Sequence, residues 1–304
     1  MNKSLINKAV FYGLLSSLFF AATFVLNRSM SLSGDSAWWS AALRFVFMLP
    51  MLYLLLGMRV NRSAVYREIR RAPRQWLLWS SVGFGLFYLP LTLSSDYAAS
   101  WLVASSWQLT IIAGILLTPL FGQAVPLKNL FFSCLIVLGV VLLQVDNLRT
   151  LSLVDSLYPL LLILVAAFAY PLGNRKMMQL VGNALSTQQR VYGMVICAMP
   201  FWSITMLIAF NNSGLPSVGQ LSQSFLVALF SGVIATILFF KATELVKHNM
   251  KQLAVIEATQ AGEILFTLLG GVLLLNDPIP SGLAFIGLLI VILGIFINGF
   301  STRS

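Results

Sequence analysis

The stretch LAVIEATQAGEILFTLLGGVLLL, residues 253–275, decides the fold of this chain. It is long and apolar enough to cross a membrane as a helix, because about 20 residues at about 1.5 Å each span the hydrocarbon core. It nevertheless contains two acids, Glu257 and Glu263. A carboxylate inside a bilayer is costly unless it is paired, protonated or hydrated, and such residues commonly mark function. The stretch therefore indicates both a membrane helix and a candidate site.

The whole chain has the composition of an integral membrane protein. Of its 304 residues, 59% are hydrophobic and 9% are charged, whereas a soluble domain is about 25% charged. The hydropathy pattern predicts an all-α protein with ten membrane helices. They lie near residues 9–29, 36–57, 75–94, 98–121, 127–145, 155–174, 190–210, 221–241, 250–275 and 281–300. The connections are too short for a soluble domain, so any function must lie between the helices.

The distribution of positive charge predicts the orientation in the membrane. If the N-terminus is cytoplasmic, all of the 19 lysines and arginines except Arg28, Arg44 and Arg149 fall on cytoplasmic segments. The positive-inside rule therefore predicts that both termini are cytoplasmic. The net charge of +10 then reflects topology and contact with the lipid bilayer, and no nucleic-acid partner is expected. Arg44 lies inside the second helix, and we expect its side chain to snorkel outward to the interface.

The sequence contains a weak internal repeat at a spacing of about 150 residues. Three pairs carry it: residues 27–30 (NRSM) with 174–177 (NRKM), Arg44 with Arg190, and residues 123–126 (QAVP) with 277–280 (DPIP). Each half holds an odd number of predicted helices, so the halves are expected to have opposite orientations. The sequence thus predicts one membrane domain built from two inverted five-helix repeats, 1–150 and 151–304, a plan typical of secondary transporters.

Several of these segments resemble a known family. The tracts FFKATE (239–244), EATQAGE (257–263) and DPIP (277–280), with the glycine-bearing last helix, are similar to the EmrE-like multidrug resistance efflux family of the drug/metabolite transporter superfamily. The run ALRF (42–45) resembles the second helix of many superfamily members. The resemblance implies a ten-helix, multi-pass protein of the bacterial inner membrane. It also implies a central cavity lined mainly by helices one, three, four, six, eight and nine.

Acidic residues of the predicted ninth helix are the leading site candidates. The small four-helix exporters of the superfamily carry their essential glutamate in the first helix, which has none here, so a glutamate of the ninth helix would have to replace it. Glu257, Gln260 and Glu263 step by three and can face one cavity. Glu263 lies deeper, where burial favours the protonated carboxyl group and suits it to take up a proton or a cationic substrate in turn. Alternatively, Glu263 is a structural partner of a buried base or backbone group, and Glu257 guards the entrance or pairs with Lys251 or another nearby base.

The fourth helix is the counterpart of the ninth in the repeat and carries Trp107 and Gln108. Aromatic side chains that face a cavity hold flat, cationic or apolar compounds, although tryptophan in membrane helices is more often interfacial or packing. Tyr88 of the third helix, with Tyr170 and Asn174 of the sixth, are further candidates for substrate contact.

The sequence lacks the usual short motifs of enzymes and pumps. We find no His-Glu-x-x-His, Gly-x-Ser-x-Gly, phosphate-loop or Cys-x-x-Cys pattern, so we expect no enzyme, metal, cofactor or ATP-driven pump. The favoured function is a secondary active exporter of small organic molecules, namely drugs or cationic and aromatic compounds, working by alternating access with proton antiport. The alternatives are an exporter of amino acids or other metabolites, and a membrane scaffold that transports nothing. The oligomeric state does not follow from the sequence.

Overall fold

The structure is a computed structural model and describes residues 3–55, 62–148, 153–246 and 250–301. Within these ranges all regular elements are helices. Those up to residue 148 are α1 (Lys3–Leu32), α2 (Ala37–Leu55), α3 (Arg62–Arg71), α4 (Pro73–Ser80), α5 (Leu86–Ser94), α6 (Ser100–Trp107), α7 (Leu109–Leu116) and α8 (Leu127–Leu148). The later ones are α9 (Leu153–Val181), α10 (Thr187–Ser213), α11 (Val218–Val227), α12 (Thr236–Val246), α13 (Met250–Ala258), α14 (Gly262–Leu275) and α15 (Gly282–Ser301).

The helical segments confirm a multi-pass membrane protein. Eight of them, among the described residues, are long and apolar enough to cross a membrane. They are Leu5–Leu32, Ala37–Leu55, Pro73–Ser94, Leu127–Val145, Leu157–Val181, Thr187–Ser213, Val218–Val246 and Val255–Leu275. Two shorter apolar helices, Ser100–Leu116 and Gly282–Asn298, stand where the fourth and tenth crossings are predicted. The count of ten crossings therefore stays a prediction.

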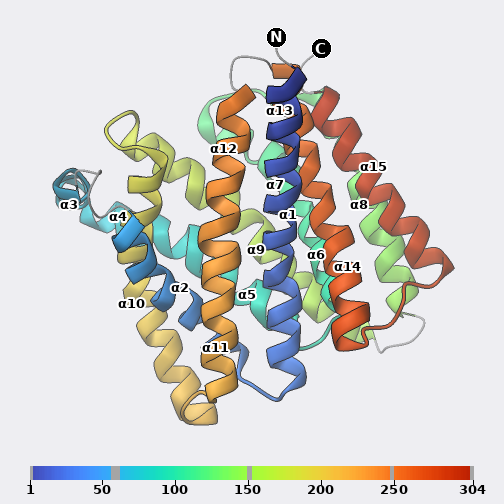
Figure 1. The fold of residues 1–304 in the computed structure, drawn as a ribbon, viewed down its shortest axis with the longest axis horizontal. Helices are drawn as coiled ribbons and strands as arrows, with labels where there is room; N and C mark the ends of the chain where they lie inside the picture. The colour runs from blue at the N-terminus through green and yellow to red at the C-terminus, as the bar shows by residue number, and fades with distance from the viewer. Residues whose placement is uncertain (1–2, 56–61, 149–152, 247–249, 302–304) are drawn as a thin grey trace.

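The helices form a bundle in which α1 lies between α12 and α14 and packs against both (Figure 1). The first turn of α1 and the last turn of α15 lie at the same end of the molecule, which we call the termini end (Figure 1). The side of the membrane on which this end lies stays a prediction. The turn between α1 and α2 and the connection between α14 and α15 lie at the other end, which we call the far end (Figure 1).

The last helix is held to α8 by direct backbone contact. A Cβ atom added to Gly139 of α8 would lie 2.6 Å from the carbonyl oxygen of Gly287, and one added to Gly287 of α15 would lie 2.7 Å from the carbonyl oxygen of Gly139. Small residues permit this approach, which supplies the packing that holds helices together in lipid. Glycine is therefore required at both positions by space rather than by backbone conformation.

Four apolar helical segments, among the described residues, are interrupted in the middle. π-Helical segments occupy Ser81–Gly85, between α4 and α5, and Ala228–Ala235, between α11 and α12. The α6 and α7 helices meet at Gln108, and a 3₁₀ turn at Thr259–Ala261 separates α13 from α14. Each interruption has a counterpart in the other half of the chain. Such breaks free backbone groups from the regular pattern and commonly accompany functional sites in membrane proteins.

The 3₁₀ turn corrects the expectation of one continuous ninth helix. The Thr259 hydroxyl donates to the Ile256 carbonyl oxygen at 2.5 Å, a local bond of the kind that competes with regular helix geometry. The turn changes the angle between the residues on its two sides. Glu257, before the turn, is exposed, whereas Glu263, after it, is only 9% exposed.

Candidate functional site

Glu263 occupies the first turn of α14, close to Gln108 at the junction of α6 and α7. The Gln108 side chain lies within hydrogen-bonding range of the Glu263 carboxyl group, and its Nε2 atom donates to the Ala104 carbonyl oxygen at 3.3 Å. The guanidinium group of Arg44 lies within electrostatic range of the same carboxyl group. No direct ion pair joins Arg44 and Glu263, both of which lie in the described part of the chain. Glu263 and Arg44 are thus both buried and within electrostatic range, but they form no direct ion pair.

The position of Arg44 contradicts the expectation that it snorkels to the interface. It is only 8% exposed, and its Nη1 and Nη2 atoms donate to the hydroxyls of Thr23, at 3.3 Å, and Ser231, at 3.1 Å. Its Cζ atom lies 4.2 Å from the ring centroid of Tyr88. The prediction was wrong because α2 turns Arg44 toward α1 and the π-helical segment, where hydroxyls and an aromatic face replace water.

Tyr88 is a support for Arg44 rather than an accessible surface. Its side chain is fully buried, and its hydroxyl accepts a hydrogen bond from Asn27 Nδ2 at 3.1 Å. Asn27 also donates to the Thr92 hydroxyl at 3.4 Å. These bonds fix the ring beneath the guanidinium group, so Tyr88 positions a charged residue of the centre.

An aromatic cluster lies beside the polar centre. The ring centroid of Phe87 is 5.0 Å from Trp107 and 4.8 Å from Tyr170, and Trp107 is 5.6 Å from Tyr170. Tyr170 remains 39% exposed and offers most of the accessible aromatic surface of the three. Sequence reasoning found Trp107 and Tyr170 but missed Phe87. Its place directly before the candidate Tyr88 was the only signal available.

The Tyr170 hydroxyl links the aromatic cluster to the charges. It lies within electrostatic range of Glu263, Arg190 and Arg44. Arg190, in the first turns of α10, is half-buried, and its Nε atom is buried without a hydrogen-bond partner. The sequence identified Arg190 only as the repeat counterpart of Arg44, and neither arginine was predicted to be part of the site.

The remaining candidates are Asn174, Gln260 and Glu257. Asn174 is half-buried and donates to the Tyr170 carbonyl oxygen at 2.9 Å, one turn earlier in α9. Gln260 is half-buried, and its Nε2 atom is buried without a partner. Glu257 is exposed, and its predicted pairing with Lys251 lies outside the side chains that the structure describes. Among the described residues, no group of three or more His, Cys, Asp or Glu residues could hold a metal ion.

A buried acid, Asp277, holds several segments together at the far end of the molecule. The Asp277 Oδ2 atom accepts from the Ser100 amide at 2.9 Å and from the Ser100 hydroxyl at 2.6 Å, while Oδ1 lies 3.5 Å from Arg28 Nε. Trp101 donates to the Pro278 carbonyl oxygen at 2.9 Å. These bonds join α1, the start of α6 and the connection after α14.

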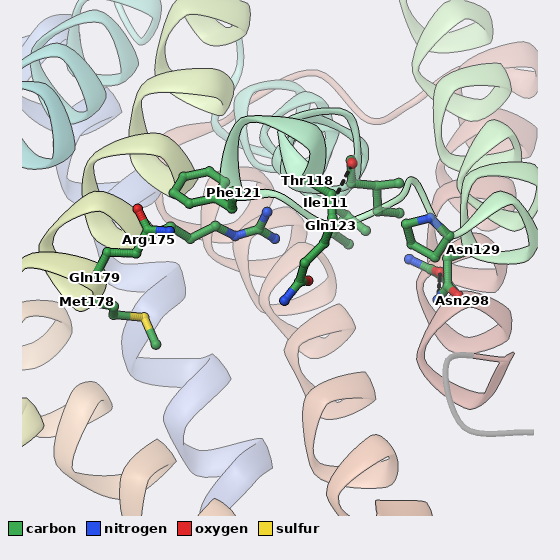
Figure 2. A pocket seen from close by; sticks show the side chains of 11 residues that line it. Ile111, Thr118, Phe121, Gln123, Asn129, Arg175, Met178, Gln179 and Asn298 are labelled. Carbon is green, nitrogen blue, oxygen red and sulfur yellow. Dashed lines mark hydrogen bonds between the residues drawn. The ribbon is translucent and has the colours of Figure 1, made fainter. Parts of the chain in front are cut away.

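The termini end instead contains an open cavity of about 570 Å³ (Figure 2). Arg175 of α9 extends into it toward the segment that carries Gln123 (Figure 2). The Arg175 Nη1 atom donates to the Gly114 carbonyl oxygen at 2.6 Å. On another wall, Asn129 donates to Asn298 at 3.2 Å and joins α8 to α15. The two ends of the molecule therefore differ: the termini end contains a cavity, and the far end contains the contact between Asp277 and Arg28.

A multi-pass helical bundle with interrupted crossings and a buried acid and base at its centre has the features of a membrane transporter. The family comparison agrees: the family described as "EmrE: Putative multidrug resistance efflux transporter" matches residues 7–304. The chain therefore belongs to this transporter family, as its sequence motifs indicate.

Two curated relatives are similar over most of their length. The chain is 46% identical to "Uncharacterized protein YjlA" of Bacillus subtilis (strain 168), an alignment that covers 97% of this chain and 95% of the relative. It is 42% identical to "Uncharacterized 42.1 kDa protein in intracellular alkaline protease 3'region" of Shouchella clausii, over 86% of this chain and 72% of the relative. Neither description names a substrate.

A solved structure described as "Crystal structure of protein" shares the fold. Its TM-score is 0.62 at 14% sequence identity, and the match covers 95% of each chain. At this identity the likeness supports the architecture alone.

Proposed function

We propose that the protein is a secondary active transporter of the bacterial inner membrane, which exports small organic molecules by alternating access and exchanges them for protons at Glu263. The observation that carries this proposal is the state of the Glu263 carboxyl group. It is buried between Gln108 and Arg44 without a direct ion pair. A carboxyl group in that setting can hold either a proton or a ligand, which is the exchange that antiport requires.

The two ends of the molecule support alternating access. The contact among Arg28, Asp277 and Ser100 closes the far end, while the cavity beside Arg175 opens the termini end. With both termini in the cytoplasm, as the positive-inside rule predicts, this arrangement is the inward-facing state. In the proposed cycle, the inverted repeats 1–150 and 151–304 exchange these roles.

A second candidate function is export of amino acids or other metabolites instead of cationic drugs. The observation that favours it is the presence of two arginines, Arg44 and Arg190, within electrostatic range of Tyr170. A site for cations is expected to carry a surplus of negative charge, whereas only one acid, Glu263, is found with them in this group of described residues.

Proton exchange can be tested without knowing the substrate. The purified protein is reconstituted in vesicles that contain a pH-sensitive dye, and a panel of aromatic cations and amino acids is added under an imposed pH gradient. We expect the wild type to release protons with at least one compound and Glu263→Gln to release none. Glu257→Gln is the matched control, because it makes the same change at an exposed glutamate. Wild-type proton release by Glu263→Gln would refute the coupling role, and no transport of any compound by the wild type would favour the scaffold.

A further inference from the structure

We propose that the cavity at the termini end binds a small organic anion, whose carboxylate is held by Arg175 and whose apolar body lies along Ile111, Ile115 and Phe121. The cavity measures about 570 Å³ (Figure 2), which is a size typical of binding sites for small molecules. This inference goes beyond the proposed function, because binding in the cavity requires neither transport nor a proton on Glu263.

The first observation is that the cavity carries a single, positive charge. Arg175 is the one charged side chain among the eleven described residues that line it. No acid in the described part of the chain forms an ion pair with Arg175. The other polar side chains of the lining are neutral, and they are Thr118, Gln123, Asn129, Gln179 and Asn298. A guanidinium group that is partly removed from water is normally balanced by an anion, so the cavity favours a ligand that brings a negative charge.

The second observation is that the guanidinium group of Arg175 is held in place in the cavity wall. Its Nη1 atom donates to the Gly114 carbonyl oxygen at 2.6 Å, and its Cζ atom lies 5.7 Å from the ring centroid of Phe121. Glycine leaves the space that this group occupies, because a Cβ atom at Gly114 would lie 3.2 Å from Arg175 Nη2. A guanidinium group has several N–H donors, and the bond to Gly114 uses one of them. The others can bind a carboxylate in a fixed orientation.

The predicted repeat supports an anion at this position. Arg175 is the counterpart of Arg28, whose Nε atom lies 3.5 Å from Asp277 Oδ1 at the far end. Gln123 is the counterpart of Asp277 and lines the cavity, but it is a neutral amide. A bound carboxylate would therefore supply to Arg175 the negative charge that Asp277 supplies to Arg28.

The lining of the cavity favours a compact, water-soluble ligand over a lipid. Ile111 and Ile115, one turn apart on α7, provide an apolar wall, and the Phe121 ring provides an aromatic one. The exposed lining residues include two amides, Gln123 and Gln179. Amide side chains prefer water to hydrocarbon, so a soluble compound can enter past them. These features favour a carboxylate on a small apolar body rather than a lipid headgroup with acyl chains.

Protection of a thiol from labelling tests the site. Met178→Cys places a thiol in the cavity lining, one turn after Arg175 on α9, in a background where both native cysteines, Cys134 and Cys197, are serine. The purified full chain in a neutral detergent is treated with N-ethylmaleimide and with phenylacetate, 2-phenylethanol or phenethylamine at constant ionic strength. We expect phenylacetate to slow labelling at millimolar concentration. The alcohol and the amine should need an at least about tenfold higher concentration for the same effect.

Variants of two arginines assign the protection to Arg175. Arg175→Gln should raise the concentration of phenylacetate that halves the labelling rate at least about tenfold. Each rate is compared with the rate of the same variant without ligand, because a nearby cation changes the reactivity of a thiol. Arg67→Gln is the matched control, because it removes an exposed arginine from α3 and should change nothing. Ser33→Cys, which replaces Met178→Cys, reports on an exposed position at the far end, where phenylacetate should not protect.

Several outcomes would overturn the anion site. They are equal protection by all three compounds, no protection by phenylacetate at millimolar concentration, or undiminished protection in Arg175→Gln. Protection by phosphatidylglycerol vesicles without protection by phenylacetate would assign the cavity to a lipid and also overturn it. If Arg175→Gln does not fold, Arg175→Lys keeps the charge and loses the planar donors, so it should weaken protection severalfold. Protection should persist in Glu263→Gln, so that a failure of the proposed proton exchange and a failure of the anion site are distinguished.

Discussion

Replacement of Asp277 by asparagine should open the far end of the molecule. The Asp277 side chain is 2% exposed and lies 3.5 Å from Arg28, whose side chain is 18% exposed. It also receives two hydrogen bonds from Ser100, at 2.9 Å and 2.6 Å. Asparagine has the same shape and can still accept from Ser100. It loses the negative charge, however, and therefore the ion pair with Arg28.

The free-energy cost of Asp277→Asn follows from the loss of the ion pair while the hydrogen bonds from Ser100 remain. Removal of one member of a buried ion pair costs about 3–5 kcal/mol, and the remaining hydrogen bonds to asparagine reduce the effect to about 2 kcal/mol. That free energy shifts the equilibrium between closed and open far ends about 30-fold toward the open state. Gly271→Ala should act in the same direction, because its Cβ atom would lie 2.6 Å from Asp277 Oδ2 and also overlap the Ser100 hydroxyl.

Maleimide labelling measures the opening. A cysteine replaces Ala98, which is 5% exposed beside the start of α6, in a background where both native cysteines, Cys134 and Cys197, are serine. We expect Asp277→Asn to raise the labelling rate by about the 30-fold population shift when the closed state dominates. Asp35→Asn is the control, because it makes the same change at an acid that accepts a hydrogen bond from the exposed Ser217 hydroxyl. An unchanged rate in Asp277→Asn would refute the role of the ion pair in closure.

Two further variants test the packing and the aromatic cluster. Gly139→Ala should lower the free energy of unfolding by about 1–3 kcal/mol, since its Cβ atom would lie 2.6 Å from the Gly287 carbonyl oxygen. Thermal unfolding in detergent measures this change, and Gly282→Ala, where no atom lies within 4 Å, should leave the midpoint unchanged. Phe87→Ala should raise the KM of a transported compound about fivefold with little change in kcat, because it removes the ring packed at 4.8 Å against Tyr170. An unchanged KM in vesicle transport would contradict a role of Phe87 in supporting the binding surface.

The sequence predicted the class of the fold and named Glu263 and Gln108 as separate candidates for the site. The hydropathy of a segment depends only on its own residues, so the membrane helices could be predicted from the sequence without knowledge of their neighbours. Glu263 was predicted as a site residue because an acid in lipid is costly. The repeat predicted that the helix of Gln108 is the counterpart of the helix of Glu263. The structure then places Gln108 against the Glu263 carboxyl group.

The misplacement of Arg44 shows what the sequence could not supply. An arginine near the end of an apolar helix can reach the interface or turn inward, and the choice depends on which neighbours offer partners. Here the partners are Thr23, Ser231 and the Tyr88 ring, which come from three other segments of the chain. The break near Thr259 was missed for a similar reason. A 3₁₀ turn inside an apolar stretch has no strong sequence signal, yet it sends Glu257 and Glu263 into different environments.

We infer that the unlike ends of the molecule follow from one difference within the predicted sequence repeat. Arg28 and Arg175 occupy corresponding positions, as do Asp277 and Gln123. At the far end the arginine meets an acid and the contact is closed. At the termini end the residue that corresponds to Asp277 is Gln123, a neutral amide. Arg175 donates to the Gly114 carbonyl oxygen, and a cavity of about 570 Å³ lies beside it. A charged pair shielded from water holds a contact more firmly than a neutral one. We infer that this single charge biases the resting protein toward the state closed at the far end, so that a ligand bound at the buried centre must offset that bias before the protein can open there.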